Sequence, residues 1–232
     1  MPSTTETTRD RILAAATDVI KRRGVVAATT KEIARAAGVS EGSLYNHFEN
    51  KTALFGAVLG EVTATARTAV MTLIGSAGEA TVHENLTNLA SEMVRFYAEL
   101  LPMTGPVLAD PELIAWLRTN TQPSGMPQGQ NDQQENGART GGLGAGALAG
   151  PVLGVAGVAA YIEAEQRHGR VKEGAPAAHL AGALLGGCQM HAFLTRLAGA
   201  EAVTAGARLP ETPDEYATGL VDAVMTGHLT ES

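Results

Sequence analysis

The chain has 232 residues, of which 44% are hydrophobic and 18% charged, a balance typical of a folded protein and not of a disordered one. Its single cysteine, Cys188, excludes an internal disulfide and suits a reducing cytosol, and its first residues lack the apolar run of a secretion signal. The net charge of −7 is unevenly divided, because residues 1–55 carry eight Lys and Arg against six Asp and Glu (+2), so the remainder carries −9. This asymmetry indicates a small basic module beside an acidic body.

The first predicted helix spans about residues 8–23. Thr7 is placed to cap its N-terminus together with Asp10, and Gly24 is placed to end it after a run of three cations. Its apolar face follows the helical period of 3.6 residues and consists of Ile12, Leu13, Ala16, Val19 and Ile20.

Two short helices follow in close succession. Thr29 opens the first in a capping box, in which the side chain of Glu32 reaches back to the Thr29 backbone. Gly38 supplies the left-handed backbone of a tight turn. Ser40 then caps the second helix, which is predicted to run to His47.

The rest of the chain is also predicted to be helical. Asn50 caps a longer helix, Pro102 is expected to stop the next one, and Asp110 with Pro111 opens another. No alternating strand pattern persists, so the sequence predicts an all-α protein with about nine or ten helices. Beyond residue 50 these span about residues 51–74, 82–101, 110–117, 147–168, 176–198 and 213–228.

Two segments depart from this pattern. Residues 122–146 contain seven Gly, five Gln, two Asn and two Pro, which cannot bury enough apolar surface to offset backbone entropy, so we expect a mobile loop. Residues 143–162 carry no charge, but they are mostly Ala and Gly and include Pro151. We therefore do not predict a membrane span there.

Residues 30–47 fit a helix-turn-helix. Ile33, Ala34, Val39 and Leu44 are expected to form the small core between its two helices. The second helix exposes Glu41, Ser43, Asn46 and His47. Such a helix is suited to lie in the DNA major groove, with its first residues at the base edges and its flanks at phosphates.

This segment resembles the N-terminal domain of TetR-family regulators. The resemblance covers about residues 8–60 and consists of many short motifs at fixed spacing. The most diagnostic is the run Gly-Ser-Leu-Tyr-Asn-His-Phe at 42–48, followed by Lys51. The others are Arg-Ile-Leu-Ala-Ala-Ala at 11–16, Gly24, Thr-Thr-Lys-Glu-Ile-Ala at 29–34, and Ala-Gly-Val-Ser at 37–40.

The resemblance implies a role for each matching position. Tyr45, His47 and Lys51 match positions that contact phosphates, as does Thr30, and a tyrosine, a histidine and a lysine can all donate to phosphate oxygens. Positions that touch or approach bases are matched by Lys31, Glu41, Gly42, Ser43 and Asn46, next to the capping Ser40.

Chemistry separates these base-facing positions. We favour Lys31 and Asn46 as base readers, since Asn can pair bidentately with adenine. Glu41 would be repelled by phosphates unless it accepted a hydrogen bond from cytosine N4. Phe48 is interpreted as a packing residue. The other positions also have structural interpretations: Thr30 as a second cap, His47 as a cation at a helix end, and Lys51 as a solvated surface charge.

The same resemblance implies what the rest of the chain does. Residues 1–55 would form the DNA-binding domain, and residues 56–232 a helical body that dimerises and holds an inducer. We expect a homodimer formed by the helices near 176–198 and 213–228, of which the first is uncharged from Leu180 to Leu194 and rich in small residues. The residues that we expect to line an effector pocket are Met71, Met93, Phe96, Tyr97, Met103, Trp116, Met190, His191 and Phe193.

The functional prediction is a cytoplasmic repressor that leaves an inverted-repeat operator when a small, largely apolar effector binds. One alternative is a DNA-binding regulator without an effector, because an apolar pocket and a solid core use the same residues. A second is a helical enzyme that uses Cys188 and His191, three residues apart on one helix. We expect no enzyme, cofactor, metal or membrane partner, since no phosphate loop, His-Glu-x-x-His or dinucleotide motif is present.

Overall fold

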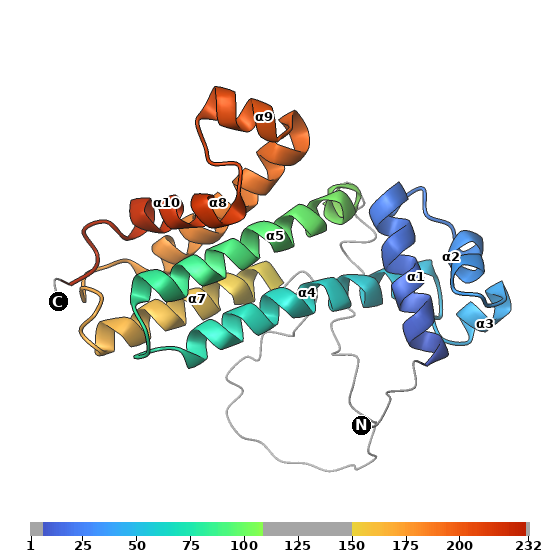
Figure 1. Cartoon of the computed structure of the whole chain (residues 1–232). Helices are drawn as coiled ribbons and strands as arrows, with labels where there is room; N and C mark the ends of the chain where they lie inside the picture. Colours follow the sequence, from blue (N-terminus) through green and yellow to red (C-terminus); the bar gives the residue numbers. More distant parts are fainter. Residues whose placement is uncertain (1–6, 109–149, 231–232) are drawn as a thin grey trace, which may run out of the picture.

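The computed structural model describes residues 7–108 and 150–230, and most of these residues lie in helices (Figure 1). Outside helices, the described part contains a single antiparallel bridge, between Val171 and Leu229. The all-α prediction is confirmed. The helix predicted from Asp110, the loop predicted at 122–146 and the pocket candidate Trp116 lie outside the described residues.

The three N-terminal helices begin and end close to where the sequence placed them. They are α1 (Thr8–Arg23), α2 (Thr30–Ala36) and α3 (Glu41–Tyr45). Thr7 Oγ1 accepts the Asp10 N–H at 3.2 Å and the Asp10 carboxylate accepts the Thr7 N–H at 3.1 Å, so the predicted cap of α1 is present. Helix α3 ends at Tyr45 and is shorter than predicted, because Asn46 is its C-terminal cap, still with right-handed helical dihedrals, and the chain continues through His47 as a turn.

Helix α4 (Lys51–Gly75) joins two hydrophobic cores. Asn50 Oδ1 caps it by accepting the Ala53 N–H at 2.8 Å. Its first half, through Leu59, is buried with α1, α2 and α3, whereas Val70 and Leu73 are buried in the larger core. The first core therefore continues past residue 55 along α4, and one continuous helix connects the two parts (Figure 1).

Helix α5 (Val82–Leu108) does not stop at Pro102, and that prediction is wrong. Proline removes one backbone donor and crowds the preceding turn, so its presence inside a helix needs compensation. Burial supplies it, since Met103 is fully buried in the core formed by the N-terminal helices and Leu100 packs against the same core. The continued helix thus ties the body to the N-terminal domain.

The larger core is built from α4 and α5 with α7 (Gly150–Arg167), α8 (Ala177–Ala198) and α10 (Pro213–Met225). Between α8 and α10 lie a short α9 (Ala200–Ala202) and a π-helical segment η1 (Val203–Ala207), which the sequence did not predict. Figure 1 shows this connection projecting from the body. Helices α8 and α10 approach closely at Gly187, where an added Cβ would lie 2.7 Å from Leu220 Cδ1.

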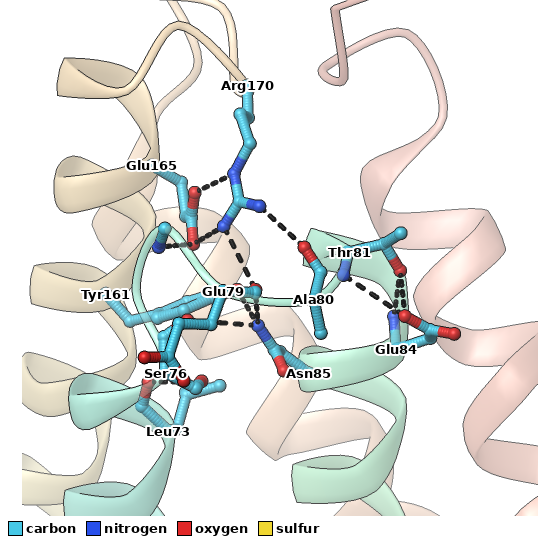
Figure 2. Close-up of polar contacts among 11 residues, drawn as sticks. Leu73, Ser76, Glu79, Ala80, Thr81, Glu84, Asn85, Tyr161, Glu165 and Arg170 are labelled. Atoms are coloured by element: carbon cyan, nitrogen blue, oxygen red, sulfur yellow. Dashed lines mark hydrogen bonds and ion pairs between the residues drawn. The ribbon is translucent and has the colours of Figure 1, made fainter. Parts of the chain in front are cut away.

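A buried ion pair fixes the turn between α4 and α5 to the end of α7 (Figure 2). The Glu165 side chain is fully buried, and both of its oxygens accept hydrogen bonds from Arg170, each at 2.6 Å. Glu165 also accepts the Gly78 N–H at 3.1 Å, and Arg170 donates to the Ala80 carbonyl at 2.6 Å. Three hydrogen bonds, two from Arg170 and one from Gly78, thus satisfy a charge that would otherwise be costly to bury.

By length and composition, α4 is apolar enough to cross a membrane. Its buried side chains are nevertheless divided between two cores of a helical protein, and it carries Glu61 and Arg67 near its middle. Burial in these cores accounts for part of its apolar character, since 28% of its most apolar window is buried.

Candidate nucleic-acid interface

The helix-turn-helix begins with the packing of α2 on α3. Ile33, Ala34 and Leu44 are almost completely buried between the helices, and Val39 packs against the same core. Gly38 has φ of +70° and lies in the left-handed region, which a side chain would strain. The Val39 N–H then donates to the Ala34 carbonyl at 2.9 Å, which closes the turn.

This packing leaves the predicted DNA-contacting residues on the surface. Thr30 and Ser43 are half-buried. The exposed members of the set are Lys31, Ser40, Glu41, Gly42, Tyr45, Asn46, His47 and Lys51. They come from α2, from α3 and its flanks, and from the first residue of α4, so the fold gathers them on one small domain.

Three of these side chains are already engaged with one another. The Thr30 hydroxyl donates to Glu41 Oε1 at 2.6 Å, and the Tyr45 hydroxyl donates to Thr30 Oγ1 at 3.3 Å. Ser40 Oγ accepts the Ser43 N–H at 3.1 Å and is therefore used as the cap of α3. Lys31, Asn46 and His47 carry no such side-chain contact among the described residues.

The ends of the motif are held by contacts that reach across the domain. Lys51 Nζ donates to the Val26 carbonyl at 3.4 Å, which links α4 to the loop before α2. Phe48 is buried, as predicted, and the Arg9 guanidinium lies over its ring at 5.1 Å from the ring centre. Sequence reasoning missed this Arg9 contact, because nothing local to residue 9 signals a partner on the far side of the motif.

The predicted capping box at Thr29 and Glu32 is only half formed. Thr29 Oγ1 accepts the Glu32 N–H at 3.2 Å, as expected of the cap. The Glu32 carboxylate, however, pairs with Arg23 at 3.1 Å instead of reaching back to the Thr29 backbone. The tertiary packing of α1 beside α2 supplies a cation, which competes successfully for the carboxylate.

Among the described residues, the expected effector-pocket residues do not converge on one site. Met93 and Tyr97 are buried in the body core with Phe96 beside them, whereas Met103 is buried in the N-terminal core. Met71, Met190 and Phe193 are exposed, with 61%, 54% and 46% of their surface accessible, so they line no interior space among the described residues. Helical periodicity in the sequence predicts which residues share a face of a helix, but it does not predict which face is buried.

The buried pair Cys188 and His191 lacks the properties of a catalytic pair. The Cys188 thiol is fully buried and donates to the Ala90 carbonyl at 3.5 Å, and desolvation raises its pKa to about 12. Its thiolate, the reactive form, is therefore disfavoured at neutral pH. His191 Nε2 is hydrogen-bonded to the Pro210 carbonyl at 2.9 Å, and its ring packs on Tyr216.

The fold and site together define a helix-turn-helix protein with a separate helical body. The family model of bacterial regulatory proteins, tetR family, matches residues 12–58. The transcriptional repressor BepR of Brucella suis biovar 1 is 47% identical over 53 residues, which are 23% of this chain and 25% of that protein. The matched segment thus spans about a quarter of such relatives.

Solved structures extend the likeness over the whole chain. SmeT, the repressor of the Stenotrophomonas maltophilia multidrug efflux pump SmeDEF, aligns over 99% of this chain and 94% of its own with a TM-score of 0.64 and 16% identity. The transcriptional regulator FadR of Bacillus subtilis, solved with stearoyl-CoA, aligns over 94% and 97% with a TM-score of 0.58 and 15% identity. Residues 12–58 thus match the tetR family of bacterial regulatory proteins, the solved structures share the fold of nearly the whole chain, and the relatives named here are regulators.

Proposed function

We propose that this protein is a homodimeric regulator that binds a specific DNA sequence and controls transcription from it. The observation that carries the proposal is the helix-turn-helix with exposed Lys31, Asn46, His47 and Lys51 on one domain. Chromosomal DNA as the partner implies a protein of the bacterial cytoplasm.

Two of the exposed residues are the proposed base readers. Lys31 begins the exposed side of α2, and Asn46 follows α3 directly, so each is free to point at a base edge. A lysine pairs with guanine acceptors and an asparagine with adenine. Tyr45, His47 and Lys51 are proposed to hold phosphates, which positions the domain without reading sequence.

The proposed dimer face lies on α8 and α10. One side of α8 carries an exposed apolar stripe, the α8 stripe, in which small residues give way to large ones toward the C-terminus. Its members, three and four residues apart, are Ala183, Gly186, Met190, Phe193 and Leu197. Small residues let two helices approach, and large exposed apolar side chains on a folded protein mark an interaction surface.

A two-fold dimer presents its recognition helices to successive major grooves on one side of the DNA. The operator is therefore proposed to be an inverted repeat. The acidic body supplies little attraction for DNA, so the paired N-terminal domains must provide the contact.

Repression relieved by a small apolar effector is the finer proposal. Its support is the fold shared with SmeT, named as an efflux-pump repressor, and with FadR, solved with stearoyl-CoA. An effector acts by favouring the dimer whose domains no longer match the groove spacing, and by linkage DNA weakens that effector equally. The alternative is a regulator without an effector; a library of apolar compounds that gives no thermal stabilisation would favour it.

Selection of genomic fragments by the purified protein tests the proposal. Saturable binding to an inverted repeat, with log affinity falling steeply with log salt, is expected of a specific dimeric regulator. Failure to enrich any sequence with a folded dimeric protein would overturn it. A Lys31→Ala variant is the matched control, since it should alter base preference while leaving the fold intact.

A further inference from the structure

Glu41 lies where a residue was expected to approach bases, yet its carboxylate is turned onto its own domain. Oε1 accepts the Thr30 hydroxyl at 2.6 Å, and Thr30 Oγ1 accepts the Tyr45 hydroxyl at 3.3 Å. Thr30 begins α2, whereas Glu41 and Tyr45 begin and end α3. The three groups form a chain of hydrogen bonds, the Glu41 relay, that joins the two helices of the motif.

We propose that Glu41 is a positioning residue that places the Tyr45 hydroxyl for a phosphate, and that it does not read a base. This inference rests on the proposed DNA-binding function. A hydrogen bond to an ionised acceptor is stronger than one between neutral groups, and the 2.6 Å distance from Thr30 to Glu41 is typical of the charged kind. Thr30 is therefore held firmly.

The relay assigns different roles to the two hydroxyls. A threonine hydroxyl has one hydrogen, and Thr30 spends it on Glu41, so it cannot donate to a phosphate at the same time. Tyr45 also has one hydrogen, which it donates to Thr30 over the longer distance of 3.3 Å, and its side chain is 46% exposed. This weaker bond holds the hydroxyl in place in the free protein and is exchanged for a bond to a phosphate on binding. Thr30 is then a link in the relay and does not itself contact a DNA phosphate.

The charge of Glu41 also has a role of its own. Phosphates repel a carboxylate on the DNA-facing surface, so the charge itself opposes binding to every sequence. The hydrogen bond to Thr30 favours binding by holding the motif in place. These two effects can be separated, because Gln keeps an acceptor oxygen but lacks the charge, whereas Ala lacks both.

The comparison of Glu41→Gln with Glu41→Ala therefore isolates the hydrogen bond. Both variants lose the repulsion, so the difference between them reports positioning alone. We expect the Ala variant to bind a selected operator about three- to tenfold more weakly than the Gln variant, the effect of one hydrogen bond. The Gln variant should bind at least as tightly as the unmodified protein.

Coupling to Tyr45 distinguishes positioning from a general structural role. Tyr45→Phe should weaken binding several-fold in the unmodified protein and in the Gln variant, and much less in the Ala variant, where the relay is already broken. Additive effects of the two substitutions would overturn the inference. Glu41 is exposed, so circular dichroism should show all variants folded.

Binding of the selected operator and of its single-base-pair variants, measured by fluorescence anisotropy, completes the test. The inference expects the same order of preferred base pairs for the unmodified protein and both Glu41 variants, with Asn46→Ala as the control that does alter preference. Loss of a cytosine preference in the Gln variant would overturn it, and so would equal binding by the Gln and Ala variants. If the unmodified protein itself selects no sequence, the proposed function fails first, and the inference falls with it.

Discussion

Replacing Arg170 by methionine should expose how much the body depends on its buried ion pair. Methionine keeps much of the side-chain length but removes both hydrogen bonds to Glu165 and those to the Glu79 and Ala80 carbonyls. The Glu165 carboxylate is fully buried and would keep the Gly78 N–H as a partner. Removing one member of a buried ion pair costs about 3–5 kcal/mol, because the remaining charge is uncompensated.

That loss should appear as a lower midpoint of thermal and urea unfolding. For a protein of this size, 3–5 kcal/mol corresponds to a fall in Tm of roughly 6–20 °C. The measurement is circular dichroism at a fixed protomer concentration, because a dimer's stability depends on concentration. Lys21→Met is the matched control: its pair with Glu99 leaves 40% and 62% of the two side chains exposed, so its loss should cost less than about 1 kcal/mol.

Acidity provides a second test of the same pair. Burial alone would raise the pKa of Glu165, but the hydrogen bonds from Arg170, the Gly78 N–H and Tyr161 together hold it below its ordinary value. A lowered folded-state pKa means stability that is present above the unfolded-state pKa and lost as pH falls through the folded one. In the Arg170→Met variant, burial dominates and raises the pKa of Glu165. The deficit of the variant, meaning its loss of unfolding free energy relative to the unmodified protein, should therefore shrink between pH 7 and pH 5. A deficit below about 1 kcal/mol at pH 7, or one that grows on acidification, would refute this account.

Three further substitutions test separate parts of the structure. Gly38→Val should cost about 1–2 kcal/mol in urea unfolding, because it forces a β-branched residue to a φ of +70°, and an unchanged midpoint would contradict the turn geometry. Thr29→Ala should cost about 1 kcal/mol through loss of the α2 cap, and a neutral result would mean that the cap is dispensable. Phe193→Asp should convert the proposed dimer to monomer in light scattering, with Thr204→Asp on the projecting η1 as the control; a persistent dimer would exclude the α8 stripe as the interface.

Local sequence signals determine where the helices of the N-terminal domain begin and where they turn. Thr7, Ser40 and Asn50 cap their helices through hydrogen bonds to residues three positions on, and Gly38 adopts its left-handed conformation because of its own lack of a Cβ. Such interactions act over one turn of chain. The order of the helices and the helix-turn-helix could therefore be predicted from the sequence.

At two other positions, tertiary contacts overrode the local sequence signal. Pro102 carries a local signal to stop a helix, and burial of Met103 in a distant core overrode it. Glu32 carries a signal for a capping box, and Arg23 on the neighbouring helix took its carboxylate. In each case, a contact between residues remote in sequence outweighed a local preference, which is worth about 3 kcal/mol for a proline inside a helix and about 1 kcal/mol for a cap.

The sequence by itself determined that this protein is helical, where its N-terminal helices begin, and which polar residues α3 exposes, because capping, turn geometry and period are properties of neighbouring residues. Only the tertiary structure decided which way the amphipathic helices of the body face. Met190 and Phe193 share helix α8 with the buried Leu184 and Cys188, and nothing in their spacing distinguishes a face turned to the core from one turned outward. The structure likewise turned Glu41 from a possible base reader into a partner of Thr30, since that bond joins residues 11 positions apart across a turn whose packing brings them together.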